Sequence, residues 1–203
     1  MGDNNVSLEE FWNVVRRLNT DVKICMTMLD ETAEDDSEGK SIWRRMTARA
    51  VFALMDSAIY GMMFQAFAAR NRPDVSFSLD ELTRLETAYD FDEDREPAAI
   101  FSRTQTLDDI RFAFNAVARV HYSDYILPIH EPGWILIKEI VHIRSALQYS
   151  RETSELRVHE ENVDTLVEGL GWLLARIVDV FKSCIETMSE YDPERGADDE
   201  LVM

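Results

Sequence analysis

The sequence predicts an all-α protein, an antiparallel helical bundle with an additional N-terminal helix. Apolar residues recur every three or four positions through most of the chain, which is the spacing of an amphipathic helix. No segment shows the sustained alternation of apolar and polar residues that is typical of a strand. With 203 residues, of which 46% are hydrophobic, the chain is long enough for one domain with a sizeable core.

Residues 1–40 are predicted to hold the additional helix and an acidic linker. Apolar residues recur between Leu8 and Leu29, and Ser7 is placed to cap the start of this helix. The stretch from Glu31 to Lys40 is acidic and contains a glycine, so an exposed linker is expected there.

Residues 41–190 are predicted to form the bundle itself. A long helix from about Ser41 to Arg70 is apolar on more than one face, which predicts a central position. Shorter helices are expected after the caps at Ser78 and Thr106, with an irregular acidic stretch over residues 90–105 between them.

Two further helices are predicted toward the C-terminus, over about residues 134–147 and 162–190. Gly171 lies within the second of these and is expected to permit close packing against a neighbouring helix. Residues 191–203 are acidic and predict a disordered tail.

The formal net charge of −18 is the strongest global property of the chain. A polyanion repels nucleic acid, so non-specific RNA or DNA binding is disfavoured and a basic protein partner is favoured. Two readings of the arginines stay open: most pair with acidic residues, or some of them form a local basic groove. The arginines in question are Arg44, Arg45, Arg49, Arg144 and Arg151.

The sequence predicts a cytoplasmic protein that does not bind a membrane. No stretch approaches the roughly 20 uncharged apolar residues of a membrane span, and the N-terminus lacks the features of a signal peptide. Cys25 and Cys184 each lie in an apolar helical pattern, which favours two core thiols over a disulfide or a metal site. A reducing compartment, in which cysteines stay as free thiols, is consistent with this interpretation.

The most specific pattern lies in the predicted helix after Gly133, where Arg144 is followed, after four intervening residues, by Tyr149. This segment resembles the motif of the HEPN superfamily, an Arg, four to six residues and a His near the end of a helix. The resemblance covers about residues 41–190, and Asp56 matches an acidic position on the first core helix of that family. It implies a helical bundle that forms a two-fold dimer around a shared cleft. Many members are metal-independent ribonucleases.

Tyr149 stands where the family has its histidine. In an active member the histidine handles the proton of the attacking ribose 2′-hydroxyl, and the arginine stabilises charge on the phosphate. A tyrosine with an ordinary pKa of about 10 is a poor base near neutral pH. The resemblance therefore implies a catalytically degenerate protein that acts through association, as a homodimer, in a prokaryotic defence or toxin-antitoxin setting. Arg144, Tyr149 and Asp56 are the candidate residues of its degenerate site.

Two alternatives stay open. The first is a divergent metal-independent ribonuclease, in which Arg144 is aided by Tyr149 or by a group from the second subunit; RNA is a partner only in that case. The second is an unrelated helical bundle that binds a small molecule or a basic protein. Glu139 and His142 have the spacing of one half of a di-iron site, but the second half is missing, so no metal is expected. Glycine loops that cradle phosphates are also missing, so no cofactor is expected.

Overall fold

The computed structural model describes residues 7–89, 107–150 and 157–190. Within these ranges the chain forms helices and no strand, which confirms the predicted all-α bundle. The helices are α1 (Leu8–Glu31), α2 (Ser37–Ala68), α3 (Leu79–Tyr89), α5 (Leu107–Val120), α6 (Pro132–Gln148) and α7 (Glu160–Glu190).

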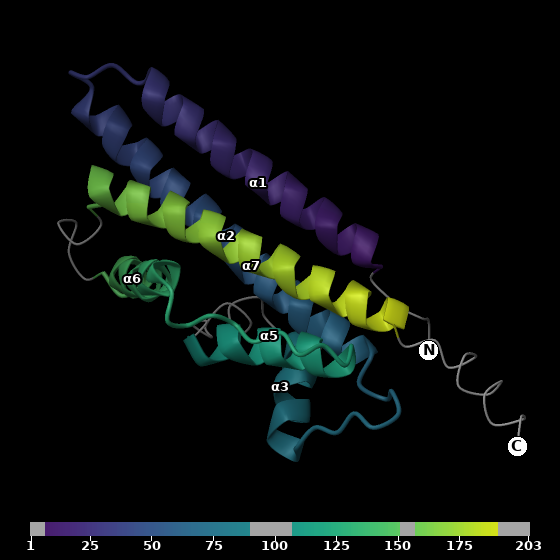
Figure 1. Ribbon diagram of the computed structural model, residues 1–203. Coiled ribbons are helices and arrows are strands. Elements are labelled where there is room, and N and C mark those ends of the chain that lie inside the picture. The colour runs from purple at the N-terminus through teal and green to yellow at the C-terminus, as the bar shows by residue number, and fades with distance from the viewer. Residues whose placement is uncertain (1–6, 90–106, 151–156, 191–203) are drawn as a thin grey trace, which may run out of the picture.

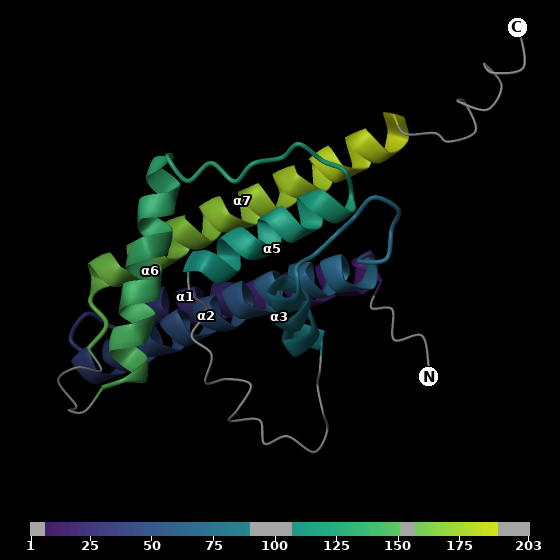
Figure 2. The same ribbon diagram turned by 90° about the horizontal axis from the view of Figure 1, so that it is seen from below.

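The helices α1, α2, α5 and α7 lie side by side, and α6 crosses the bundle near one end (Figures 1 and 2). The chain colours show that α1 and α2 are antiparallel, whereas α5 and α7 run in the same direction as α2. After α5, the connection over residues 121–131 runs back along the bundle, and α6 then crosses near the end at which α7 begins (Figure 2). Helix α2 contacts α1, α3, α5 and α7, which confirms its predicted central position.

The connection between α1 and α2 is shorter than predicted. The expected linker from Glu31 to Lys40 is wrong in its second half, because α2 already begins at Ser37. The Asp36 side chain caps this helix by accepting a hydrogen bond of 2.8 Å from the Gly39 backbone N–H. A carboxylate near the first turn is also favoured by the helix dipole. The acidic residues that suggested a solvated linker therefore start a helix.

Other predicted helix boundaries are confirmed. The Ser7 hydroxyl accepts the Glu10 N–H at 3.1 Å at the start of α1. The capping box before α3 is complete, since Ser78 N–H donates to the Glu81 carboxylate at 2.8 Å and Glu81 N–H donates to the Ser78 hydroxyl at 3.3 Å. The irregular stretch at 90–105 and the tail at 191–203 lie outside the described residues.

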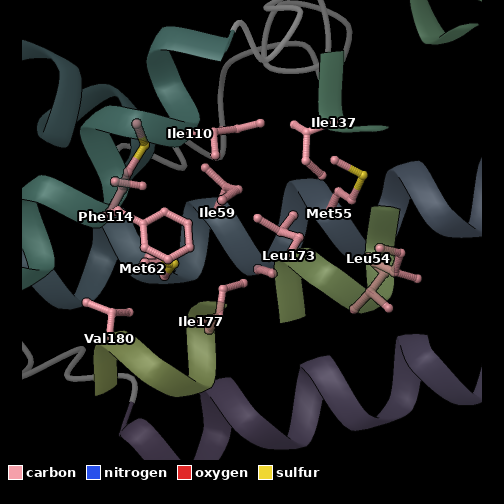
Figure 3. Close-up of a cluster of buried hydrophobic side chains, with 14 of the residues drawn as sticks. Leu54, Met55, Ile59, Met62, Ile110, Phe114, Ile137, Leu173, Ile177 and Val180 are labelled. Atoms are coloured by element: carbon pink, nitrogen blue, oxygen red, sulfur yellow. The ribbon is translucent and has the colours of Figure 1, made fainter. Parts of the chain in front are cut away.

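The core forms where four helices bring their apolar faces together around α2 (Figure 3). The labelled side chains are Leu54, Met55, Ile59 and Met62 of α2, Ile110 and Phe114 of α5, Ile137 of α6, and Leu173, Ile177 and Val180 of α7. All ten are buried. Cys25 and Cys184 are buried free thiols, as the sequence predicted.

Helix α2 is unusually apolar for its length. By length and composition it could cross a membrane, and 50% of its most apolar window is buried inside the bundle. Core helices of soluble proteins pass the same test, so this property is weak evidence for a membrane span. Most of the remaining residues of that window are half-buried, which is consistent with a central helix of the bundle.

Gly169, and not Gly171, is the glycine at which helices pack closely. A Cβ atom at Gly169 would lie 2.5 Å from Ile140 Cδ1 and 3.1 Å from Leu136 Cβ, both on α6, whereas nothing lies within 4 Å of one at Gly171. We expect Gly169→Ala to lower the free energy of unfolding by about 1–2 kcal/mol through overpacking. Gly171→Ala should raise it by about 0.5–1 kcal/mol through helix propensity. Urea unfolding of both variants tests this pair, and equal effects would contradict it.

Candidate functional site

A pocket of about 330 Å³ opens between α2 and the C-terminal half of α6. It combines three arginines and one carboxylate with an apolar wall. Its lining residues are Arg45, Arg49, Phe52, Ala53, Asp56, Arg144, Leu147 and Gln148. Both helices reach the pocket through residues three and four positions apart, which is the spacing of one helix face.

An ion pair between Arg144 of α6 and Asp56 of α2 forms the centre of the pocket. The Arg144 guanidinium donates a hydrogen bond to the Asp56 carboxylate, and the two side chains are only 15% and 18% exposed. The guanidinium carbon also lies 5.9 Å from the centre of the Phe52 ring. Burial raises the pKa of Asp56, and the hydrogen bond and charge of Arg144 act in the opposite direction. Arg144 is thus held by a partner on the neighbouring helix.

The predicted basic groove is assembled only in part. Arg45 and Arg49 line the pocket together with Arg144, and Arg45 donates a 2.7 Å hydrogen bond to the Ser41 hydroxyl. Arg44 points elsewhere and forms a 3.3 Å ion pair with Glu160 at the start of α7. Arg151 lies outside the described residues. Each of the two interpretations therefore applies to some of these arginines. Arg44 pairs with an acidic residue of another helix, whereas Arg45, Arg49 and Arg144 line one pocket.

Tyr149 lies outside this pocket. It is the C-cap of α6, its backbone N–H bonds to the Ser145 carbonyl at 3.1 Å, and its side chain is 63% exposed. The structure thus brings together Arg144 and Asp56 of the three candidate residues and leaves Tyr149 at the surface.

Phe52 and Gln148 also line the pocket, although no sequence motif marks them. Each lies four residues from a candidate residue on the same helix, Phe52 from Asp56 and Gln148 from Arg144. That i, i+4 spacing was the available signal, because such residues share a helix face. It could not show which faces of α2 and α6 would meet.

His142 is exposed on α6, while Arg144 two residues later turns toward α2. In the part of the chain that the structure describes, no group of three or more His, Cys, Asp or Glu side chains is placed to hold a metal ion.

A second polar cluster tethers the loop after α2 to the end of α5. Arg72 donates to the Val120 carbonyl and to His121 Nδ1, both at 3.0 Å. Burial, assisted by the Arg72 charge, lowers the pKa of His121 to about 4. The imidazole is therefore neutral near neutral pH, which leaves Nδ1 free to accept the bond. These contacts hold the loop after α2 against the end of α5, so they give His121 a structural role.

Comparison with known proteins identifies no relative: no match was found among protein-family models, curated proteins or solved structures. The fold and the pocket define the chain as an all-α bundle with a cationic site between two helices. The resemblance to the HEPN superfamily stays a prediction.

Proposed function

We propose that this protein acts through association, as a homodimer, and that it is a catalytically degenerate HEPN-like protein rather than a ribonuclease. The observation that best supports the loss of ribonuclease activity is the engagement of Arg144 by Asp56 in a largely buried ion pair. The proposal includes the setting that the resemblance implies, a prokaryotic defence or toxin-antitoxin system.

The chemistry of the pocket favours the degenerate reading. Cleavage of RNA at the ribose 2′-hydroxyl needs a proton acceptor within hydrogen-bond reach and a cation that is free to meet the phosphate. None of the described residues that line the pocket is a histidine, and Tyr149 is not among them. Arg144 donates to Asp56 through Nη1, and the carboxylate offsets the positive charge that the guanidinium would otherwise present to a phosphate.

A specific observation favours the runner-up, a divergent metal-independent ribonuclease. Arg45 and Arg49 stand beside the Arg144 and Asp56 pair, so the pocket has two more positive than negative side chains in a chain of net charge −18. A concave site with this local charge attracts phosphate groups. The same charge would also suit a small organic anion, which is the small-molecule alternative.

A nuclease assay tests the proposal. The purified protein and its Arg144→Lys variant are incubated with mixed single-stranded RNA in EDTA, and circular dichroism verifies that both are folded. Lysine keeps the charge that pairs with Asp56 but loses the planar guanidinium that binds phosphate through two donors.

We expect no cleavage by the parent. Cleavage by the parent that Arg144→Lys abolishes would overturn the proposal and establish the ribonuclease. Equal cleavage by both proteins would indicate a contaminating nuclease, because a reaction at this pocket requires the guanidinium.

A further inference from the structure

The pocket between α2 and α6 has different chemistry at its two ends. Arg45, Arg49, Phe52 and Asp56 reach it from one face of α2. Arg49 and Asp56 are seven residues apart, which corresponds to about 10 Å along the helix axis. The ion pair between Arg144 and Asp56 therefore lies at one end, and the side chains of Arg45 and Arg49 start from the other.

Arg45 and Arg49 form a pair of like charges. They are four residues apart on α2, so their side chains are neighbours, and such a pair destabilises a helix. Acidic residues outnumber basic ones by 39 to 21 in the chain. In the ranges that the structure describes, however, neither arginine forms an ion pair with any of them. An anion bound between the two guanidinium groups would relieve their repulsion.

The rest of the pocket is suited to an apolar group. Phe52 of α2 and Leu147 of α6 contribute apolar side chains to its wall, and Ala53 has only a methyl group, which leaves space beside them. The volume of about 330 Å³ lies at the small end of the range for pockets that bind organic molecules. A small molecule with one acid group and one apolar part matches both regions.

The apolar wall favours a singly charged acid group over a phosphate dianion. Attraction to the fixed charges of the arginines grows in proportion to the charge of the ligand, whereas the cost of removing an ion from water grows with the square of that charge. A carboxylate carries a single charge and presents two oxygens in one plane, which is the geometry that a guanidinium binds through two donors.

We propose that this pocket binds a small organic carboxylate, with its acid group at Arg45 and Arg49 and its apolar part against Phe52 and Leu147. Arg144 keeps its ion pair with Asp56 in this arrangement. The inference goes beyond the proposed function, because it requires neither a homodimer nor a degenerate nuclease. It also differs from the ribonuclease alternative, in which the same pocket would receive a phosphate of RNA.

Isothermal titration calorimetry on the full chain tests the proposal. Three carboxylates with different apolar parts serve as probes: phenylacetate, isovalerate and hexanoate. Phenylacetamide is the matched control ligand, because it has the shape of phenylacetate without the charge. We expect at least one carboxylate to bind at a single site with a dissociation constant at or below about 1 mM. Phenylacetamide should bind at least about tenfold more weakly than phenylacetate.

Three variants locate the ligand. Arg49→Gln removes one positive charge, and Ala53→Trp fills the pocket without changing the charge; both residues are exposed, so the fold does not depend on their side chains. Arg17→Gln removes an exposed arginine of α1 and controls for the change in net charge. We expect the first two variants to bind the carboxylate at least about tenfold more weakly and Arg17→Gln to bind it as the parent does. Circular dichroism verifies that each variant is folded, and Arg49→Gln carries the test alone if Ala53→Trp is not.

Two results would overturn the proposal outright. One is the absence of saturable binding by all three carboxylates, and the other is binding that Arg49→Gln weakens no more than Arg17→Gln does. Phenyl phosphate tests the acid group separately. Tighter binding of phenyl phosphate than of phenylacetate would overturn the choice of a carboxylate and favour the ribonuclease alternative.

Discussion

Arg144→Ala is expected to lower the free energy of unfolding by about 2–4 kcal/mol at neutral pH. The substitution leaves Asp56, only 18% exposed, without the guanidinium that it pairs with. Removing one partner of a buried pair costs more than the pair itself contributes, because the remaining charge is desolvated. The residual exposure of both side chains places the effect at the lower part of the usual range. Chemical denaturation of the parent and the variant at pH 7 measures it.

Two controls identify the uncompensated carboxylate as the cause. Adding Asp56→Asn to Arg144→Ala removes the stranded charge, so the double variant should recover at least half of the loss. Lower pH should also recover stability. The pKa of Asp56 is already raised in the folded protein and would rise further without Arg144. A carboxyl with a raised folded pKa binds its proton more readily in the native state, so stability is lost as pH rises through that pKa and restored below it.

The loss caused by Arg144→Ala should therefore shrink between pH 7 and pH 4. A deficit that stays constant over this range, and that Asp56→Asn does not reduce, would show that the lost contact between the guanidinium and the Phe52 ring is responsible instead.

Gly133→Ala is expected to lower the free energy of unfolding by about 2–3 kcal/mol. Gly133 lies in the first turn of α6, directly beneath the Trp172 ring of α7, and a Cβ atom there would lie 2.1 Å from Trp172 Cδ1. The ring is held in place because Trp172 Nε1 donates a 2.8 Å hydrogen bond to Glu131. Accommodating the methyl group therefore displaces the indole and breaks that bond. Thermal and urea unfolding of the variant measure the cost.

A double-mutant cycle with Trp172→Leu tests whether the indole is the obstacle. Without the ring, the added methyl group meets less resistance, so Gly133→Ala should cost less than about 1 kcal/mol in the Trp172→Leu background. Additive effects of the two substitutions would contradict this steric explanation and indicate a backbone effect at Gly133.

Much of the fold could be predicted because its determinants are local. The capping serines Ser7 and Ser78 and the apolar spacing within each helix involve residues three or four positions apart, so they are visible in the sequence. The all-round apolar character of α2 predicted its central position for the same reason. The linker over residues 31–40 was mispredicted because acidic residues suit both a solvated loop and the first turn of a helix, and the Asp36 cap decides between them.

The candidate site could be predicted only as far as the resemblance to the HEPN superfamily reached. That resemblance identified Arg144 on one predicted helix and Asp56 on another. Their direct contact, eighty-eight positions apart, depends on how α6 crosses α2. Tyr149 was expected beside Arg144, but the helix ends there and its side chain points to solvent.

The sequence by itself determined where helices form and which of their faces are apolar, because helical periodicity and capping are local properties of the chain. Only the tertiary structure decided which faces meet. It selected Gly169 rather than Gly171 for close packing, and it left Ile24 of α1 and Ile42 of α2 exposed. The physical reason is that apolar burial is non-directional. Periodicity marks a face that must be covered, and the packing of side chains over the whole bundle decides what covers it.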